Sequence, residues 1–540
     1  MPTRTRRATV SLTLFLGTCA VAGALLNGRV NAQSATDETT VRDSLHQFTD
    51  VYSVIESNYA DKLSGDKIDK VIYDGAIPNM LHVLDPHSNF FDPKAYAQMR
   101  EDQHGRYYGV GMQIQPQVGK DGIQRVVVVN TFDGSPAAKA GIRPGDAIFM
   151  IDAKSGDGLD SLQVSTLLKG AKGTHVGVQM LREGQDKPLT FDLMRDEIPR
   201  PAVDLAYMIK PGIGYIRVVN FSSESTSHEV GDALAKFGPE LQGLLIDMRG
   251  NPGGLLNEAV AMSDKFLSRG DIVVSQKGRS FQDVVYKANH GESGKKYPIV
   301  ILVNRNTASA AEIVSGALQD HDRALIVGET TFGKGLVQTV FQIAENTGLA
   351  LTTYHYYTPS GRLIQRDYSG VSMYDYFYVR KDAKPADKTN LEVKQTDSGR
   401  TVYGGGGITP DEKIESPRSN PFENNLLVHG AFFNFTKHYL AHRDISKDFA
   451  VDDAVLNDFK GFLKSEKVDY SDADLSANLP WVKSNIKASL FTSQFGTNEG
   501  LRARIDDDPQ VLKAITYMPE ALALEQRSEK NKDVRTASLQ

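Results

Sequence analysis

Cysteine is almost absent from this sequence. The 540 residues contain one cysteine, Cys19, and it lies in an N-terminal segment that we expect to be removed. A mature chain without thiols has no disulfides, no cysteine nucleophile and no cysteine-ligated zinc. Its stability must come from packed cores, and because this length is too great for one core we expect roughly three to four domains.

The sequence also lacks an excess of positive charge. It has 61 Lys and Arg residues against 67 Asp and Glu, and four of the arginines lie in residues 1–32, which contain no acidic residue. Without that segment the net charge is −10. We therefore expect no general affinity for nucleic acid.

A long apolar run lies near the N-terminus, from Ala8 to Leu26. It follows the basic start TRTRR and precedes Val30-Asn31-Ala32, which has small residues at both specificity positions of a signal-peptidase site. We interpret residues 1–32 as a cleaved signal peptide and expect export to the periplasm or another extracytoplasmic compartment. The run is long enough to span a bilayer. The alternative is therefore an uncleaved membrane anchor. We expect no membrane contact other than this one.

Several familiar motifs are incomplete. Asp232 stands where a zinc-binding helix starting at His228-Glu229 needs its second histidine, and no serine lies in a Gly-x-Ser-x-Gly turn. Gly328–Gly335 resembles a phosphate loop, but a glycine replaces the Mg²⁺-binding Ser or Thr, and a strand rather than a helix is predicted next. We expect no metal or cofactor, and nucleotide binding is a third hypothesis that titration with ATP and Mg²⁺ would test.

The hydrophobic periodicity first indicates a helical region and then a strand-rich one. Helical spacing over residues 33–103, interrupted by a polar turn at Asp61–Gly65, predicts a helical N-terminal region. Residues 104–195 contain short alternating segments, the first at Gly109–Ile114, around two short helices. This pattern is typical of a peptide-binding β-module.

Residues 196–416 alternate between strands and helices, which predicts a largely parallel, layered α/β domain. The strands are expected at Gly214–Val219, Gly243–Asp247, Ile272–Ser275, Ile299–Val303, Ala324–Val327 and Leu349–Tyr357. Active sites of such domains gather at the carboxyl ends of the strands. The stretch Lys381–Arg400 is polar and is expected to be a loop. Residues 417–540 predict a helical C-terminal region, with a charged and disordered tail after about Leu524.

Ser309 is the best candidate nucleophile. It follows the apolar strand Ile299–Val303 at the start of a predicted helix, where the amide of Ala310 could stabilise an oxyanion. The alternative is that Ser309 and Glu312 form a capping box, in which the serine only satisfies the helix end. Other polar residues just before it could cap equally well and would leave Ser309 free.

Lys334 is a candidate general base. A lysine amine is protonated at neutral pH, but burial can lower its pKa until it accepts a proton. Gln338, four positions on, shares a face with it in either a helix or a strand, and its amide oxygen could orient the amine without adding charge. The alternative is a solvated loop lysine.

The loop Asp247–Gly254 follows a predicted strand and precedes a predicted helix. Its paired glycines, Gly253 and Gly254, would let a backbone amide approach a substrate carbonyl. A second oxyanion donor could come from either glycine, and the alternative is an ordinary tight turn.

Together these segments resemble the carboxyl-terminal processing, or tail-specific, proteases of peptidase family S41. The resemblance begins at Leu84–Ser88 and ends near Asp411, and its segments are Tyr215–Arg217, Asp247–Gly254, Asn306–Glu312, Gly328–Gln338 and Tyr403–Asp411. It implies a multidomain α/β protein whose layered protease core is of the ClpP/crotonase type. It also implies the roles of the residues: Ser309 as nucleophile, Lys334, 25 positions later, as general base, Gln338 as its orienting partner, and Ala310 with Gly253 or Gly254 as oxyanion hole.

The resemblance further implies that residues 104–195 are a PDZ domain. Its carboxylate-binding loop would be Tyr108-Gly109-Val110-Gly111-Met112, whose amides receive the free C-terminus of a polypeptide substrate while the peptide adds as a strand. Lys169 stands where relatives often have an arginine that couples peptide binding to the protease core. Lysine cannot supply a bidentate fork, so gating and simple tethering by the PDZ domain both stay open.

The sequence thus predicts an exported serine endopeptidase that recognises protein C-termini and cleaves with a Ser309/Lys334 dyad through an acyl-enzyme. The alternative from another class is a catalytically idle PDZ scaffold that binds C-terminal peptides. The helical segments 37–99 and 418–524 are candidate surfaces for self-association or for an adaptor protein, by composition only.

Overall fold

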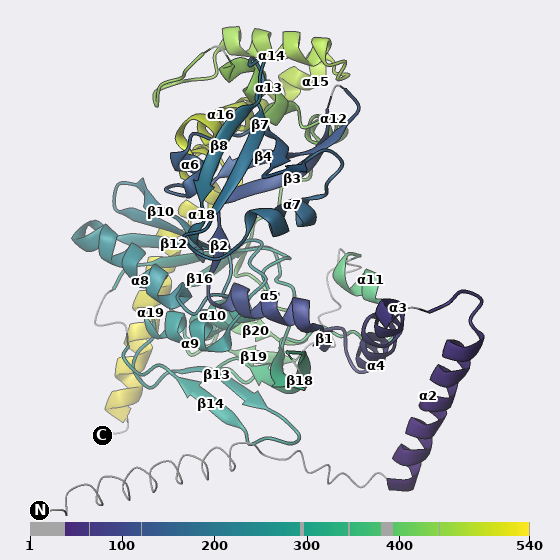
Figure 1. Ribbon diagram of the computed structural model, residues 1–540. Helices are drawn as coiled ribbons and strands as arrows, with labels where there is room; N and C mark the ends of the chain where they lie inside the picture. The colour runs from purple at the N-terminus through teal and green to yellow at the C-terminus, as the bar shows by residue number, and fades with distance from the viewer. Residues whose placement is uncertain are drawn as a thin grey trace, which may run out of the picture. The chain divides into compact units, whose positions relative to one another are not determined.

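The computed structural model describes residues 38–63, 65–119, 121–291, 296–343, 346–379, 392–441 and 443–538 (Figure 1). They divide into two compact units, one ending at Pro78 and the other beginning at Asn79. The predicted signal peptide, residues 1–32, lies outside the described residues. No helix in the described ranges is long and apolar enough to cross a membrane.

The first unit is helical, as the spacing of its apolar residues predicts. It contains α2 (Glu38–Asn58), α3 (Gly65–Lys70) and a π-helical segment, η1 (Val71–Ala76). Apolar side chains of α2, among them Val41 and Leu45, are exposed. Helix α4 (Ile77–His82) leads into the second unit.

The second unit begins with a turn at Leu84–Ser88, where the predicted helical lead-in ends. A short strand, β1 (Asn89–Phe91), and helix α5 (Pro93–Gln103) follow. The carboxylate of Asp92 caps α5 by accepting the amide of Ala95 at 2.7 Å. This part of the chain therefore contributes a strand to the rest of the molecule and is not wholly helical.

A β-module occupies the next hundred residues. Its main sheet has the strand order β3-β4-β5-β7-β8, so β3 is an edge strand, and a separate pair joins β2 to β9. The strands are β2 (Arg106–Gly109), β3 (Met112–Val118), β4 (Gln124–Thr131), β5 (Ala147–Ile151), β6 (Lys154–Ser155), β7 (His175–Leu181), β8 (Leu189–Met194) and β9 (Asp196–Pro199). The helices are α6 (Pro136–Lys139) and α7 (Ser161–Leu168), close to their predicted positions.

The single strand expected at Gly109–Ile114 is wrong, because the chain turns between β2 and β3. Gly111 has φ +78°, and a Cβ there would lie 2.3 Å from the Cβ of Ser135. Only glycine fits this position. The kink lets β2 leave the main sheet and pair with β9.

The α/β domain that follows is built around a six-stranded sheet with the order β10-β11-β12-β15-β16-β21. The first two strands are antiparallel and all later neighbours are parallel, as expected for a largely parallel domain. The strands are β10 (Val203–Lys210), β11 (Ile213–Val218), β12 (Gly243–Asp247), β15 (Ile299–Val303), β16 (Leu325–Gly328) and β21 (Glu412–Lys413).

Both faces of this sheet are buried, which explains the continuous apolar runs of its strands. On β12, Leu244 and Ile246 contribute to one core, whereas Leu245 contributes to the other. The first core is shared with helices α8 (Thr226–Phe237), α9 (Leu256–Asp264) and α10 (Ala310–Asp320), with the 3₁₀ turn η2 (Gly238–Glu240) after α8. The second core is shared with α17 (Thr497–Ile505), α18 (Pro509–Ile515) and α19 (Met518–Ser538).

A second, antiparallel sheet corrects the expectation that the strands near residues 272 and 349 belong to the parallel sheet. Its order is β1-β18-β13-β14, with β17 paired along the other side of β18. The strands are β13 (Ile272–Lys277), β14 (Val284–Lys287), β17 (Leu336–Gln342) and β18 (Gly348–Tyr357). Further elements are helix α11 (Met373–Phe377) and a hairpin of β19 (Val393–Gln395) and β20 (Thr401–Tyr403). Part of the polar stretch expected as loop is therefore strand, and residues 380–391 lie outside the described ranges.

The C-terminal region is not one helical block. Helices α12 to α16 enclose a core to which α17 adds Ala503, and α17 to α19 pack on the central sheet. The former are α12 (Pro421–Val428), α13 (Ala431–Leu440), α14 (Asp453–Ser465), α15 (Asp472–Ala477) and α16 (Leu479–Phe495).

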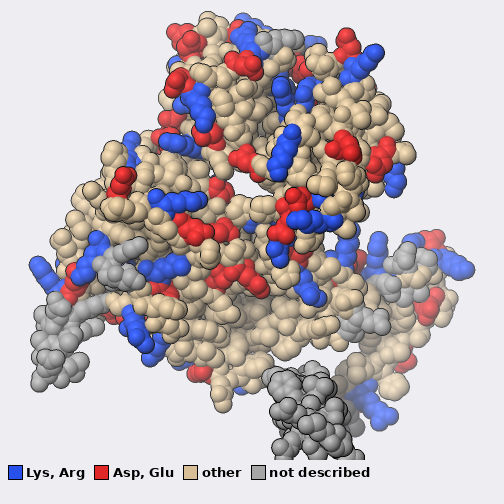
Figure 2. All heavy atoms as spheres, turned by 60° about the vertical axis from the view of Figure 1, so that its left-hand side comes forward, with Lys and Arg blue, Asp and Glu red and all other residues tan. Residues whose placement is uncertain are grey.

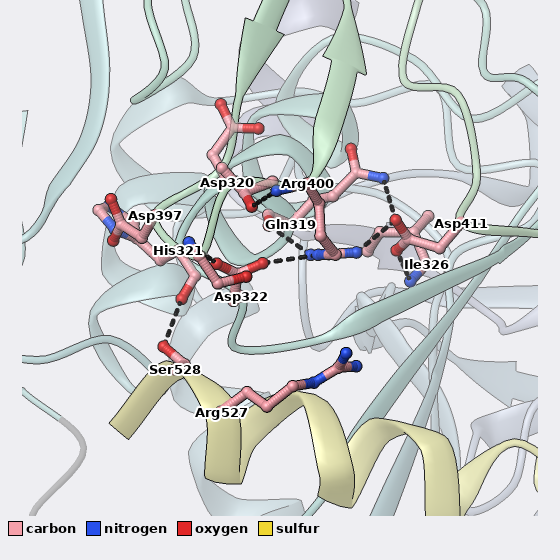
Figure 3. Close-up of polar contacts among 12 residues, drawn as sticks. Gln319, Asp320, His321, Asp322, Ile326, Asp397, Arg400, Asp411, Arg527 and Ser528 are labelled. Atoms are coloured by element: carbon pink, nitrogen blue, oxygen red, sulfur yellow. Dashed lines mark hydrogen bonds and ion pairs between the residues drawn. The ribbon is translucent and has the colours of Figure 1, made fainter. Parts of the chain in front are cut away.

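The expectation of a disordered tail after about Leu524 is wrong, because α19 continues to Ser538. Leu524 and Ser528 are buried, and the Ser528 hydroxyl donates to the carbonyl of His321 at 3.3 Å (Figure 3). His321 itself lies between the Asp397 carboxylate and the carbonyl of Ile272, at 2.8 and 2.7 Å from its ring nitrogens. The tail is therefore fixed at the C-terminal end of α10. Elsewhere, basic and acidic side chains are interspersed over the face in Figure 2.

Candidate active site

Ser309 lies where the chain passes from β15 into α10, with strained backbone angles. Its φ of 55° and ψ of −117° are outside the regions that L-residues normally occupy. Strain of this kind persists only where the surroundings impose it. Here the Ser309 amide donates to the Glu312 carboxylate at 2.8 Å, and its carbonyl accepts the Tyr356 hydroxyl at 3.2 Å.

Glu312 connects the candidate nucleophile to the candidate base. Its side chain is fully buried, and one carboxylate oxygen accepts the amides of Ser309 and Lys334 at 2.8 and 2.9 Å. The other oxygen accepts the amide of Gly333 at 2.7 Å and the hydroxyl of Thr331. Because all four partners donate, the arrangement fits the ionised carboxylate. Burial nevertheless raises the pKa of Glu312, while these hydrogen bonds oppose the rise.

The capping box considered as the alternative for Ser309 is present in the structure. Glu312 does reach back to the Ser309 amide, as in a capping box. The amide of Glu312, however, also donates to the backbone carbonyl of Ser309 at 2.8 Å. Of the preceding polar residues, Asn306 and Thr307, that could cap the helix instead, Thr307 donates its hydroxyl to the Met248 carbonyl at 2.8 Å. The capping box is therefore complete, and the Glu312 amide is shared between the side chain and the carbonyl of Ser309.

Lys334 is half-buried, which argues against a fully solvated loop lysine. Burial lowers the pKa of its amine below the usual value, and the negative charges of Glu312 and Asp85 oppose this effect. A lowered pKa is what a lysine needs to act as a base near neutral pH.

Gln338 lies on β17, beside β18. A bulge in this ladder places Val337 opposite Tyr354 and Gln338 opposite Thr352, so that β18 carries one extra residue. The Nε2 amide of Gln338 donates to Thr352 Oγ1 at 3.1 Å. Its amide oxygen is then turned away from Thr352.

The glycine loop after β12 contacts the start of α10. A Cβ on Gly253 would lie 2.7 Å from the Cβ of Ser309 and 2.8 Å from the Ala310 nitrogen. The Gly253 amide donates to Asn251 Oδ1 at 2.9 Å. Gly254 is held against Phe221 by a β-bridge, and a Cβ there would lie 2.1 Å from the Phe221 carbonyl carbon. Both glycines are required by close approach, and Gly253 is the one beside Ser309.

His87 belongs to the Leu84–Ser88 segment and interacts electrostatically with Lys334. Burial, together with the charge on Lys334, lowers its pKa to about 3. The Tyr376 hydroxyl accepts an amide hydrogen of Gln365 at 3.2 Å and lies 2.9 Å from His87 Nε2. The hydroxyl proton of Tyr376 is therefore free to be donated to Nε2 of His87. The imidazole of His87 is neutral.

The residues expected to form the PDZ carboxylate loop are only partly in a loop. Tyr108 and Gly109 belong to β2, where they pair with Glu197 and Asp196, and Met112 begins β3. Val110 and Gly111 alone lie between the strands, because β2 extends further than the sequence indicates. They lie at the start of the edge strand β3, where a further strand could be added.

Lys169 does not contact the core around Ser309 through any hydrogen bond in the described residues. Its amine forms an ion pair with Glu101 of α5 at 2.8 Å and lies 5.2 Å from the centre of the Tyr107 ring. Lys169 therefore links the β-module to the helix that precedes it.

Four residues of the site were not assigned a role from sequence. Glu312 was considered only as a helix cap, and Asp85, Ser88 and Thr352 were given no chemical function. Asp85 and Ser88 are part of the segment that begins the family resemblance, which was the one available signal. Thr352 has the appearance of an ordinary strand threonine, and only strand pairing places it beside Gln338.

Comparison with known proteins identifies the family. The model of peptidase family S41 matches residues 212–373, and a PDZ domain model matches residues 104–193. A carboxy-terminal-processing protease of Bartonella bacilliformis is 38% identical over 354 residues, covering 64% of this chain and 79% of that protein. The chain belongs to peptidase family S41. It is a serine-type peptidase with a PDZ domain, in the group of C-terminal processing proteases, as the sequence predicted.

A second relative, a solved structure and a third domain model are also similar to this protease. The carboxy-terminal processing protease CtpA of Bacillus subtilis is 33% identical over 358 residues, covering 65% of this chain and 74% of that protein. A solved structure of a photosystem II D1 C-terminal processing protease is 30% identical, with a TM-score of 0.33, and covers 68% of this chain and 92% of that one. Residues 422–473 match a model described as a probable PDZ-protease C-terminal helical domain.

Proposed function

We propose that this protease cleaves polypeptides with Ser309 as nucleophile and Lys334 as general base. The observation that carries the proposal is the buried carboxylate of Glu312, which binds the backbone amides of both residues. Two loops 25 residues apart are thereby held at one site beside the glycine loop. The lowered pKa of Lys334 supports its role as the proton acceptor.

The reaction begins with a neutral Lys334 amine. Ser309 Oγ attacks the scissile carbonyl carbon while Lys334 takes the hydroxyl proton. The oxyanion accepts hydrogen bonds from Ala310 and from the glycine loop. The C–N bond then breaks, Lys334 returns the proton to the leaving amine, and an acyl-enzyme remains. Water attacks this ester with Lys334 again accepting a proton, and Ser309 is released.

The second oxyanion donor is Gly253 or Gly254. Gly253 lies beside Ser309, but its amide would have to exchange Asn251 Oδ1 for the oxyanion. The Gly254 amide has no hydrogen-bond partner within the described ranges, and its α-carbon packs on Phe221. Whichever glycine is the donor, the amide comes from the same loop and the oxyanion of the substrate occupies the same position.

The PDZ domain is proposed to select free C-termini. The amides around Val110 and Gly111 would receive the carboxylate while the peptide adds to β3. Amidating the last residue of a substrate removes that charge, and charge-assisted hydrogen bonds of this kind are worth about 1.5–3 kcal/mol. We expect roughly tenfold to hundredfold slower cleavage well below saturation. Equal cleavage of the amide and the free acid would contradict selection of C-termini.

Export is proposed from the sequence of residues 1–32, with an uncleaved membrane anchor as the alternative. Self-association and an adaptor protein are proposed for the exposed helical surfaces, such as the apolar face of α2.

Mass spectrometry of the products from an unfolded exported protein tests the proposed activity. The wild-type protease should generate discrete internal cleavages, and Ser309→Ala and Lys334→Ala should generate none. Cleavage by Lys334→Ala at the wild-type rate would contradict the dyad. Absence of cleavage and of serine labelling in the wild type would favour the idle scaffold.

A further inference from the structure

The turn at Leu84–Ser88 contains a buried acidic residue. Asp85 is 6% exposed, and its Oδ1 accepts the amides of His87 and Ser88 at 2.7 and 2.8 Å. Its Oδ2 accepts the Ser88 hydroxyl at 2.6 Å. An ionised carboxylate only accepts hydrogen bonds, so the single hydroxyl proton of Ser88 points toward Asp85.

Ser88 Oγ also contacts Thr352 at two atoms. The amide of Thr352 donates to it at 3.0 Å. The Ser88 hydroxyl also lies 3.4 Å from Thr352 Oγ1 in donor geometry, so Thr352 Oγ1 is the acceptor in this longer contact. Thr352 Oγ1 therefore presents an acceptor to its remaining partner.

That partner is Gln338, whose Nε2 lies 3.1 Å from Thr352 Oγ1. An amide can meet an acceptor only with its NH₂ group, so the direction of the preceding bonds decides which way the amide of Gln338 faces. Its oxygen is left on the other side, and the described residues provide no hydrogen-bond partner for it.

Strand pairing brings the three segments together. Asn89 pairs with Ala350 on one side of β18, which places the preceding residue, Ser88, near Thr352. On the other side of β18, the bulge places Gln338 opposite Thr352. Without the bulge, the partner of Gln338 would be Thr353.

We propose that Asp85, Ser88 and Thr352 are positioning residues, whose chain of hydrogen bonds turns the amide oxygen of Gln338 toward the amine of Lys334. The inference rests on the proposed dyad and deepens it. The chain would exclude the flipped amide, in which an NH₂ group would face the amine. The electrostatic influence of Asp85 on Lys334 is consistent with this placement.

Thr352→Val tests the proposal with little change in shape. Valine removes Oγ1 but keeps the backbone amide that donates to Ser88. We expect kcat to fall about threefold to tenfold, as for the loss of one net hydrogen bond, and Thr352→Ser to stay within about twofold of wild type. In the wild type, the oriented amide oxygen favours the ammonium form of Lys334 and so raises the pKa of the amine. Thr352→Val loses this orientation, so the acidic limb of its pH–rate profile should move to lower pH.

Thr353→Val is the matched control. It removes a hydroxyl on the same strand that lies 2.6 Å from the hydroxyl of Thr339 and has no hydrogen bond to Gln338. We expect it to leave kcat and the pH profile unchanged. Equal effects of the Thr352 and Thr353 variants would overturn the proposal, because a structural role for strand hydroxyls would then suffice. Melting temperatures of all variants identify any that fail to fold, and Ser88→Ala replaces a misfolded Thr352→Val.

A double-mutant cycle with Gln338→Ala isolates the path of the effect. If Thr352 acts through Gln338, Thr352→Val should cost nothing further in the Gln338→Ala background. The same loss in both backgrounds would overturn the proposal while leaving the dyad intact. The dyad itself fails only if Lys334→Ala keeps its activity, so the two failures are distinguishable.

Discussion

Replacing Glu312 by glutamine should weaken both the fold and the catalysis of this protease. The carboxylate has four donors, and an amide can accept from only one side. The hydroxyl of Thr331 can rotate to accept an N–H, whereas backbone amides cannot. We therefore expect the new NH₂ group to face Thr331 and Gly333, so that the Gly333 amide loses its acceptor.

A buried N–H without an acceptor costs about 1–3 kcal/mol, and replacing charged by neutral hydrogen bonds costs about 1 kcal/mol more. The expected loss is about 2–4 kcal/mol, or a fall of roughly 4–16 °C in Tm. Because the charge of Glu312 raises the pKa of Lys334, its removal should also move the acidic limb of kcat/KM to lower pH.

Differential scanning calorimetry and a pH series of peptide cleavage measure these effects. Glu329→Gln is the matched control, since Glu329 pairs with the exposed Arg305 at 3.1 Å and should cost less than about 1 kcal/mol. A Glu312→Gln protein with the Tm and the pH profile of the wild type would refute the role assigned to this carboxylate.

Three further predictions concern the base, the imidazole and the glycine loop. Lys334→Arg keeps the positive charge but cannot lose it, so cleavage should be abolished while the fold persists; measurable turnover would contradict a lysine base. Because His87 is neutral with a pKa of about 3, His87→Phe should retain the single ionisation that controls the rate near and above neutral pH, as seen in a pH–rate profile. Gly253→Ala places a methyl 2.7 Å from the Ala308 carbonyl oxygen and should abolish most activity, whereas Gly250→Ala has a similar positive φ with nothing within 4 Å and should retain it; equal activities would remove the glycine loop from the site.

The inner strands of the central sheet were predictable because they are apolar on both faces. Ile299–Val303 and Gly243–Asp247 show this directly, and their boundaries match β15 and β12. The antiparallel sheet was not predictable, since β1 and β18 are separated by more than 250 residues and nothing local indicates their pairing. The last helix was expected only to about Leu524, because charges dominate the composition beyond it, although Ala521, Leu524 and Ser528 are buried at helical spacing.

The site was predictable to the level of residue types at strand and helix ends. Ser309 and Lys334 are candidates because each follows an apolar strand next to small residues, and the family resemblance selects them over the structural alternatives. The strained backbone of Ser309, the bulge before Gln338 and the four donors around Glu312 depend on tertiary contacts. Glu312 is compatible with an ordinary helix cap in the sequence, and only its complete burial distinguishes the two roles.

Labelling with a fluorophosphonate probe tests the central claim most directly. Peptide mass spectrometry should locate the adduct on Ser309, and the labelling rate should rise with pH through one ionisation below the usual pKa of lysine. Lys334→Ala should label far more slowly and without that ionisation. An adduct on another serine, or labelling of Ser309 at the same rate without Lys334, would contradict the account.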